Sequence, residues 1–443
     1  MSEAPSIGAA PPGPDARRIL ERLQAVLYKG TAHDLGPFVI SGKHDRQVED
    51  TDGNVYLDLI SGMASVPLGA AAPAITKAAV AALRRYGNED THYFAHEFVL
   101  PLAEKLLAIA PSNLARVDMA LNGTEAVETA VRFMRRATGR PIVIGFMGGY
   151  HGEAGTAGAA GAETSDLSFG YRALLPGYVH VPYPNPYRTP FLARPGGTGD
   201  GTIDYLRDHL LHHAIDPREV AGVLIEPVMG SGGCVAPPEV FWTGLTDLCR
   251  EFDFLLCADE VKTGFGRAGT MFAVERWGVQ PDLMALGKAM GGGVMPIGAV
   301  LGTERAMDFA DVSTGSTWSW LPASCAAALE TLAVFEREPV LENVRALEGV
   351  ALGALASLMQ EHPQIGDVRA VGCFMAVEFV KDRATKERDM ELTRRVAWEC
   401  LQQGLLVDAS TTSLNLQPSL VMPAAELLLA FEILGTAIVR AVA

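Results

Sequence analysis

Short apolar runs alternate with amphipathic stretches through the middle of the chain. Four runs are short, rich in leucine or β-branched residues and followed by loops: PIVIGF, GVLIEP, FLLCADE and LMALG. Apolar residues recur at helical spacing over residues 74–86, 97–109 and 123–140. Strands that alternate with helices favour an α/β fold with a mostly parallel sheet covered on both faces. The Gly-rich stretch 152–161 and the Pro- and Tyr-rich stretch 182–197 predict long active-site or interface loops.

The two ends of the chain predict a smaller α+β unit. The first 15 or so residues are rich in Pro, Gly and Ala, which predicts disorder, and a helical pattern follows them. VEDTDGNVYLDLISG predicts a hairpin that turns at Asp52-Gly53, and GDVRAVGCFMAVEFV predicts a second one. The apolar C-terminus carries charges too closely spaced for a membrane span and predicts a packed helix. The expected division is an N-terminal segment of the small domain, a large domain and a C-terminal small domain, over residues 1–64, 65–330 and 331–443.

Composition narrows the possible partners. The chain has 443 residues, 49% of them hydrophobic, and a formal net charge of -16. Such a charge repels phosphate backbones and anionic lipid, so neither nucleic acid nor a membrane is expected as a partner. The six cysteines show no metal-binding spacing, so no metal site is predicted, and they indicate buried, reduced thiols. With no signal-peptide pattern at the N-terminus, we expect a cytoplasmic protein.

Two residues at predicted strand ends suggest the chemistry. Lys288 follows the apolar run in PDLMALGKAMGGG, where partial desolvation lowers the pKa of an amine and allows it to form an imine. Asp259 ends FLLCAD, and a carboxylate aimed at a pyridine nitrogen keeps that ring positive as an electron sink. Each residue alone has an ordinary explanation, a surface lysine or a loop cap. Together they predict pyridoxal 5′-phosphate bound to Lys288 as a Schiff base.

Other residues are candidates for holding this cofactor. Val261 and Tyr150 are expected to pack on the two faces of the ring, although core packing and a lid or interface position are the alternatives. Gly123 and Thr124 begin a helix, whose free N–H groups and positive dipole end suit a phosphate. The alternative is that Asn122 or Thr124 is only a plain helix cap.

The sequence gives weaker evidence for four more candidate site residues. Thr317, in GSTWSWLP, is a second hydroxyl for the phosphate, and Glu226 lies at a third strand end, with a core ion pair as its alternative. His151 is assigned to the pocket, since a histidine there is more often a satisfied polar residue than an acid or base. Trp318 lines the substrate channel or fills a subunit interface.

The motifs together resemble the class III aminotransferases that depend on pyridoxal phosphate and have fold type I. They occur in that family's order and spacing over nearly the whole chain: NGTEA, YHG, IEP, DEVKTGFGR, PDLMALGKAMGGG and TWSWLP. The resemblance implies a large domain with a mainly seven-stranded sheet and a small domain built from both termini. It also implies a homodimer with shared active sites, in which Thr317 binds the phosphate of the neighbouring subunit. In such enzymes the lysine matching Lys288 moves the proton between Cα and the cofactor.

The chain departs from the family where substrate carboxylates are held. Members acting on 4-aminobutyrate-like substrates often carry an arginine directly after the HG dipeptide and another near the C-terminus. Glu153 and Asn415 stand in those places here, and Ser231 stands where a partner glutamate is frequent. Two bidentate carboxylate ligands are therefore missing. Arg172, Arg188 or another loop arginine remains an alternative source of that contact.

These departures leave two activities to weigh. The favoured one is an aminotransferase that acts on small amino and oxo substrates, with Glu153 near a distal cation of the amino donor. The alternative is a racemase or epimerase of amino acids, their amides or lactams, because relatives of that kind share stretches like PYPNPYR and HPQIGDVR. The two differ in where the proton returns. A non-catalytic protein is disfavoured, since it would be expected to lose Lys288, Asp259 or the phosphate loop.

Overall fold

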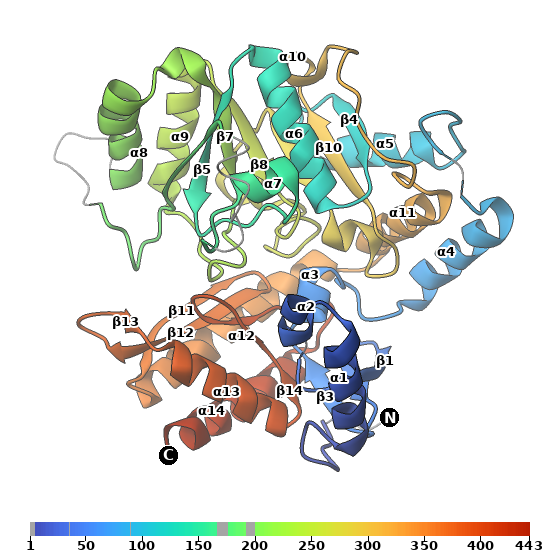
Figure 1. The fold of residues 1–443 in the computed structure, drawn as a ribbon, viewed down its shortest axis with the longest axis vertical. Coiled ribbons are helices and arrows are strands. Elements are labelled where there is room, and N and C mark those ends of the chain that lie inside the picture. The colour runs from blue at the N-terminus through green and yellow to red at the C-terminus, as the bar shows by residue number, and fades with distance from the viewer. Residues whose placement is uncertain (1–4, 35, 89, 166–175, 192–199) are drawn as a thin grey trace.

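The chain folds into two halves that meet across the middle of the molecule (Figure 1). A large sheet with helices on its faces forms one half, and two smaller sheets form the other, which also holds both termini. The computed structural model describes residues 5–34, 36–88, 90–165, 176–191 and 200–443.

The large sheet has seven strands in the order β4-β10-β9-β8-β7-β5-β6. Only β10 runs against its neighbours, so the predicted seven-stranded, mostly parallel sheet is confirmed. Its strands are β4 (Arg116–Ala120), β5 (Ile142–Met147), β6 (Tyr178–Pro182), β7 (Val220–Ile225), β8 (Leu255–Asp259), β9 (Leu283–Leu286) and β10 (Gly298–Gly302).

The central strands of this sheet are buried on both faces. Every residue of β7, β8, β9 and β10 is buried, which explains why their sequences are continuous apolar runs without alternation. Helices on opposite faces supply the covering layers, with α6 (Gly123–Thr138) packing in one core cluster and α9 (Glu239–Phe252) in another. The carboxyl ends of the parallel strands meet at one edge of the sheet, because these strands all run in the same direction.

Further helices complete this half. They are α4 (Pro73–Tyr86), α5 (Val99–Ile109), α7 (Gly155–Ala160), α8 (Gly201–Tyr205), the π-helix η1 (Leu206–Ala214), the 3-10 helices η2 (Pro217–Glu219), η3 (Ala273–Trp277) and η4 (Lys288–Gly291), α10 (Glu304–Met307) and α11 (Pro322–Arg337). The helix α11 packs along α4 and leads into the smaller half.

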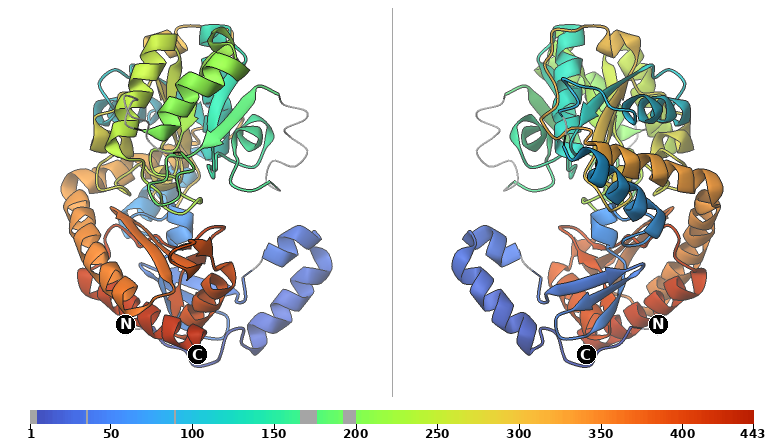
Figure 2. Two further views of the ribbon diagram at one scale, coloured as in Figure 1. Left: turned by 90° about the vertical axis from the view of Figure 1, so that its left-hand side faces the viewer. Right: turned by 90° about the vertical axis from the view of Figure 1, so that its right-hand side faces the viewer.

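The smaller half is built from both ends of the chain, as predicted. Strands β1 (Ile40–His44), β2 (Gln47–Asp50) and β3 (Val55–Asp58) form one sheet, and β14 (Leu405–Leu406) joins it parallel to β3. The other sheet contains β11 (Ile365–Val371), β12 (Phe374–Asp382), β13 (Glu387–Arg388), β15 (Asp408–Ala409) and β16 (Leu414–Leu416). The helices are α1 (Pro14–Val26), α2 (Lys29–Asp34), α3 (Ser61–Ala64), α12 (Val340–Glu361), α13 (Met390–Gln402) and α14 (Ala424–Val442). Figure 2 shows α1 and α2 standing away from the body of the molecule.

Two local predictions were wrong. Residues 5–13 are ordered, because Ser6 pairs with Val55 through backbone hydrogen bonds of 2.9 and 2.8 Å. The Asn54 side chain also accepts hydrogen bonds from the next turn of this segment. Composition alone suggested disorder, but partners far along the chain hold the segment. The stretch 152–161 is not a continuous loop, since its second half forms α7.

Other expectations have mixed outcomes. Both predicted hairpins and the packed C-terminal helix are confirmed. All six cysteines are buried and unpaired. Among the described residues no helix is long and apolar enough to cross a membrane. The stretch 182–197 is irregular from residue 183 to 191, and its remainder lies outside the described residues. The domain limits stay a prediction, and α11 runs across residue 330.

Candidate active site

Three neighbouring parallel strands end at one cavity. Glu226 follows β7, Asp259 ends β8, and Lys288 lies two residues after β9, so the sheet brings together residues that are far apart in sequence. The cavity has a volume of about 160 Å³. Its lining consists of Asn122, Gly123, Thr124, Tyr150, His151, Gly152, Glu226, Ser231, Asp259, Val261, Lys262 and Lys288. The predicted cofactor residues other than Thr317 are all in this set.

Lys288 has an unusual backbone conformation, and the pKa of its side chain is lowered. Its φ of 41° is rare for a residue with a side chain, and such strain clusters at functional sites. Its Nζ lies 5.9 Å from the centroid of the Tyr150 ring. Burial, and then the positive charge of Lys262, lower the pKa of Lys288 to about 8. A useful fraction of this amine is therefore neutral near physiological pH.

Asp259 is paired with His151 deep in the cavity. The Asp259 Oδ2 lies 2.7 Å from His151 Nδ1, and Oδ1 accepts a 3.0 Å hydrogen bond from the Val261 N–H. His151 is only 3% exposed. Burial lowers the pKa of His151, but the hydrogen bond to Asp259 and its charge outweigh burial, so the net shift is upward. The pair fixes the orientation of the carboxylate. It was not predicted, since a partner 108 residues away leaves no local signal.

Glu226 positions the loop that carries the aromatic residue. Its Oε1 accepts a 2.9 Å hydrogen bond from the Tyr150 N–H, and its Oε2 accepts one of 2.9 Å from the Gly230 N–H. The Tyr183 hydroxyl donates to the Glu226 carbonyl at 2.9 Å. Burial raises the pKa of Glu226, and the nearby His151 opposes that shift. Glu226 thus lies in the cavity wall, where its hydrogen bonds connect the segments that contain Tyr150 and Gly230.

The N-terminus of α6 forms another wall of the cavity. Asn122 caps this helix by accepting a 3.0 Å hydrogen bond from the Glu125 N–H. A Cβ on Gly123 would come within 2.5 Å of Val261 Cγ1, and one on Gly152 within 2.6 Å of Thr124 Oγ1. Only glycine leaves this wall clear, so the free N–H groups of the first helical turn remain accessible to an anion.

This donor set fits pyridoxal 5′-phosphate. The α6 N-terminus suits its phosphate, the Asp259 carboxylate suits its ring nitrogen, and the Lys288 amine suits its aldehyde. Tyr150 and Val261 both line the same cavity and offer an aromatic and an aliphatic surface to a flat ring.

Four predicted residues lie outside the cavity lining. Glu153 is exposed and accepts a 3.1 Å hydrogen bond from the Tyr150 hydroxyl. Thr317 is exposed, and Trp318 is 53% exposed. Asn415 is fully buried on β16 and accepts a 2.8 Å hydrogen bond from Ser413 Oγ.

Arg188 does not supply a cation to the cavity. Arg188 forms an ion pair with the buried Glu378, which also contacts Arg369 and Arg388. Arg172 lies outside the described residues. A second lysine, Lys262, lines the cavity beside Lys288, and the sequence analysis passed over it inside DEVKTGFGR. A lysine three positions after the strand-end Asp259 and two before the first glycine of GFG was the available signal.

Comparison with known proteins identifies the family. The family model "Aminotransferase class-III" matches residues 30–438. An alanine/serine racemase of Pyrococcus horikoshii is 34% identical over 92% of this chain and 86% of its own length. An isoleucine 2-epimerase of Lentilactobacillus buchneri is 32% identical over 90% of this chain and 89% of its own. An amine transaminase from an uncultivated Pseudomonas species, solved in its PLP-bound form, is 30% identical with a TM-score of 0.87, covering 94% of this chain and 97% of that one.

The match confirms the predicted family, fold and cofactor. It covers the cavity, both hairpins and most of the C-terminal helix. The fold agrees with that of the solved amine transaminase over nearly its whole length. The chain therefore belongs to the class III aminotransferase family and, as a member, is an enzyme of pyridoxal 5′-phosphate acting on small amino and oxo compounds.

Proposed function

We propose that this enzyme is an aminotransferase that moves an amino group from an amine or amino-acid-like donor to an oxo acid or aldehyde. The observation that carries the proposal is the single cavity shared by the Lys288 amine, the Asp259–His151 pair and the α6 N-terminus. The amine transaminase of the same fold supports it.

Each residue has a task in this reaction. When bound, the cofactor supplies an aldehyde that captures amines and a ring that accepts electrons from Cα. The α6 N–H groups would hold its phosphate, and Asp259, oriented by His151, would keep a proton on its ring nitrogen. Lys288 would anchor the cofactor through its amine. During turnover the Lys288 amine would take the proton from the substrate Cα and carry it to its next acceptor. A pKa of about 8 suits both halves of that transfer.

Racemisation is the second candidate. The observation in its favour is that the alanine/serine racemase and the isoleucine 2-epimerase both align over about nine-tenths of the chain. The same residues would bind the substrate and remove the proton. The difference is that the proton would return to Cα, from either side, and no amino group would be transferred.

A single-substrate experiment separates the two. The holoenzyme is given one amino acid or amine in D₂O without any oxo acid, and products are followed by chiral chromatography and mass spectrometry. An aminotransferase makes about one oxo product per active site, stops, and resumes when pyruvate is added. A racemase continues without an acceptor, placing deuterium at Cα as optical purity falls. Lys288→Ala is expected to abolish either activity, with the exposed Lys381→Ala as its control; full turnover by Lys288→Ala would refute both assignments.

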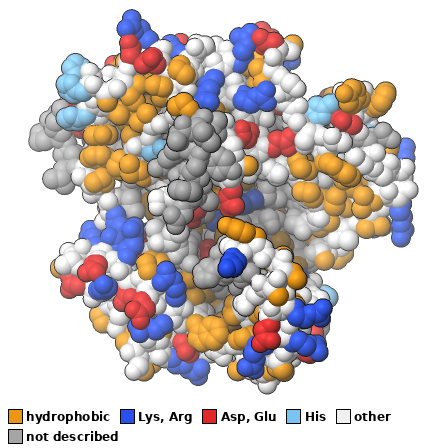
Figure 3. All heavy atoms as spheres, in the orientation of Figure 1, with side chains coloured by type: hydrophobic (Ala, Val, Ile, Leu, Met, Phe, Trp, Pro, Cys, Tyr) orange, Lys and Arg blue, Asp and Glu red, His pale blue; other side chains and the backbone are white. Residues whose placement is uncertain are grey.

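We propose that the enzyme works as a cytoplasmic homodimer with shared active sites. Figure 3 shows hydrophobic side chains gathered over the side where α4 and α5 lie. Large exposed apolar residues of that region include Val80, Leu83, Tyr93, Phe94 and Leu100. Covering them would remove an apolar surface from water. The exposed Thr317 would then be free to reach the phosphate held by the neighbouring subunit. Sedimentation velocity tests the dimer.

A further inference from the structure

A short glycine-rich segment of the large half forms part of the active-site wall. It runs from Gly230 to Gly233, and its Ser231 lines the same cavity as Lys288. Glu226 fixes the start of this segment by accepting a 2.9 Å hydrogen bond from the Gly230 N–H. The place of Ser231 therefore depends on what holds the rest of the segment.

Side chains of the small half hold the other end of this segment. The Gly232 carbonyl accepts a 2.9 Å hydrogen bond from the Thr412 hydroxyl, and the Gly233 carbonyl accepts one of 2.6 Å from Arg369 Nη1. Among the described residues no backbone N–H bonds to either carbonyl. Both glycines are buried, and a buried carbonyl left without a donor costs free energy. The small half thus completes the hydrogen bonding of a segment that belongs to the large half.

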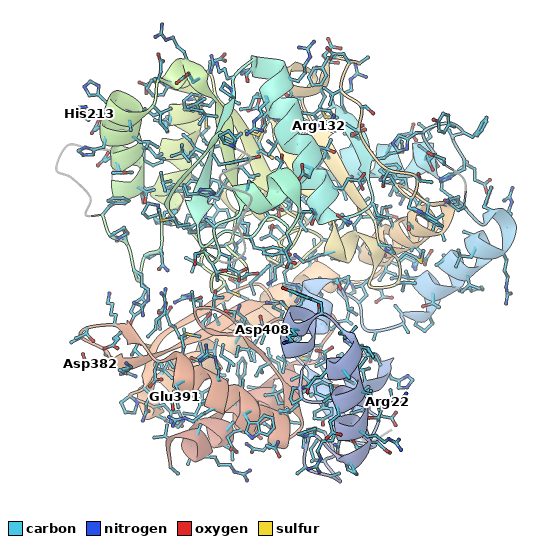
Figure 4. All side chains as sticks on the ribbon, in the orientation of Figure 1. Arg22, Arg132, His213, Asp382, Glu391 and Asp408 are labelled. Atoms are coloured by element: carbon cyan, nitrogen blue, oxygen red, sulfur yellow. The ribbon has the colours of Figure 1, made fainter. Side chains whose placement is uncertain are left out.

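Two separate parts of the small half reach this segment. Arg369 lies on β11, whereas Thr412 lies in the turn between β15 and β16. Figure 4 labels Asp408, the first residue of β15, near the centre of the molecule where the two halves meet. The contact is therefore a junction between the halves and not a detail of one of them.

The segment is packed closely from both sides. Gly233 has a φ of 116°, which a residue with a side chain rarely adopts. A Cβ on Gly233 would come within 2.8 Å of Thr412 Oγ1 and 2.9 Å of Arg369 Nη1. On the opposite side, a Cβ on Gly232 would come within 2.6 Å of the Gly148 carbonyl. A change in the donors of the small half is therefore transmitted to the segment.

Arg369 is itself fixed by buried charges. Its Nε donates a 2.6 Å hydrogen bond to Asp367, and its Nη2 pairs with Glu378. The Glu378 side chain is only 1% exposed and also pairs with Arg188 from the large half. A guanidinium is a planar fork that can serve several acceptors at once. Arg369 therefore connects a buried ion-pair network to one carbonyl of the active-site wall.

We propose that Arg369 is a positioning residue for the reaction, and that it acts with Thr412 to hold Ser231 at the wall of the active-site cavity. Both residues lie outside the lining of that cavity, so they act through the segment and not on the reacting atoms. The inference goes beyond the proposed function, because the same wall serves transamination and racemisation.

A matched pair of arginine substitutions tests this role in the holoenzyme, with the fastest substrate found in the single-substrate experiment. Arg369→Gln is expected to lower kcat/KM on the order of 10- to 100-fold, because small displacements around a reacting centre have effects of this size. Arg388→Gln removes another cation that contacts Glu378, at 3.4 Å, and leaves the hydrogen bonds of the segment intact. It should change kcat/KM less than about 3-fold, although both substitutions disturb the same ion-pair network and lower Tm. Arg369→Lys keeps the charge without the planar fork, so it should restore Tm but not kcat/KM.

Amide hydrogen exchange follows the segment directly and needs no substrate. Peptides covering residues 229–235 of the holoenzyme should exchange at least about tenfold faster in Arg369→Gln than in Arg388→Gln. This result is expected even if the proposed function fails altogether. Thr412→Val removes a single hydroxyl, so it should fold normally and show a smaller change in the same direction, in both exchange and kcat/KM.

Two results would overturn the assignment. One is normal exchange with normal kcat/KM in both Arg369→Gln and Thr412→Val, whatever the change in Tm, because Arg369 would then serve stability alone. The other is an equal effect of Arg388→Gln, which would place the cause in the ion-pair network. Should Arg369→Gln fail to fold, Thr412→Val decides, and unchanged exchange of its segment refutes the proposal.

Discussion

Lys288 is expected to titrate near pH 8, far below an ordinary lysine. Burial and the charge of Lys262 lower the pKa of Lys288 to about 8 from 10.5, while the charges of Asp259, Glu226 and Glu163 oppose the shift. At pH 7 about one Lys288 side chain in ten is therefore neutral, against about one in 3,000 for a lysine of pKa 10.5. The lowered pKa therefore makes the fraction of protein with a neutral amine, the form that attacks an aldehyde, about 300 times larger at pH 7.

The rate of cofactor uptake measures this pKa. Cofactor-free protein is mixed with pyridoxal 5′-phosphate at different pH values, and visible absorbance is followed by stopped flow, with Lys288→Ala as the blank. The rate should rise with pH and reach half its maximum near pH 8. Lys262→Met removes a positive charge and should move the midpoint upward, but only part of the way to 10.5, since burial is the larger cause. Lys262→Arg should leave it nearly unchanged. A midpoint near 10 in the unaltered protein, or a lower one in Lys262→Met, would refute the reasoning.

Three other substitutions probe the surrounding structure. Asp259→Asn keeps the shape but removes the charge at the ring nitrogen, so kcat should fall roughly 100- to 1,000-fold with an unchanged circular dichroism spectrum; normal kcat would contradict its role. Gly123→Ala should weaken cofactor binding on the order of tenfold through overpacking against Val261, whereas the uncrowded Gly353→Ala should have no effect in the same fluorescence titration. Glu378→Leu leaves its arginine partners without a buried counter-charge and should cost about 3–5 kcal/mol, seen as a lower Tm; an unchanged Tm would show that the network contributes no stability.

The sequence by itself determined the elements and the cofactor chemistry. Continuous apolar runs such as the one before Asp259 are possible only in strands buried on both faces, and they predict a covered parallel sheet. Glu226, Asp259 and Lys288 were each assigned to the site from their places at predicted strand ends, and all three line the cavity. The hairpin at Asp52-Gly53 was equally local, since its turn residues and alternation lie within one short stretch.

Only the tertiary structure decided which polar groups meet. His151 pairs with Asp259, and Arg188 contacts Glu378, although the residues of each pair lie more than a hundred positions apart. The sequence around one member of a pair gives no indication of the other. The order of residues 5–13 likewise depends on a distant strand. Lys262 is a further case, because among the described residues its buried Nζ has no hydrogen-bond partner. Whether a buried polar group finds an acceptor depends on every element packed around it, so its partners become visible only when the chain is folded.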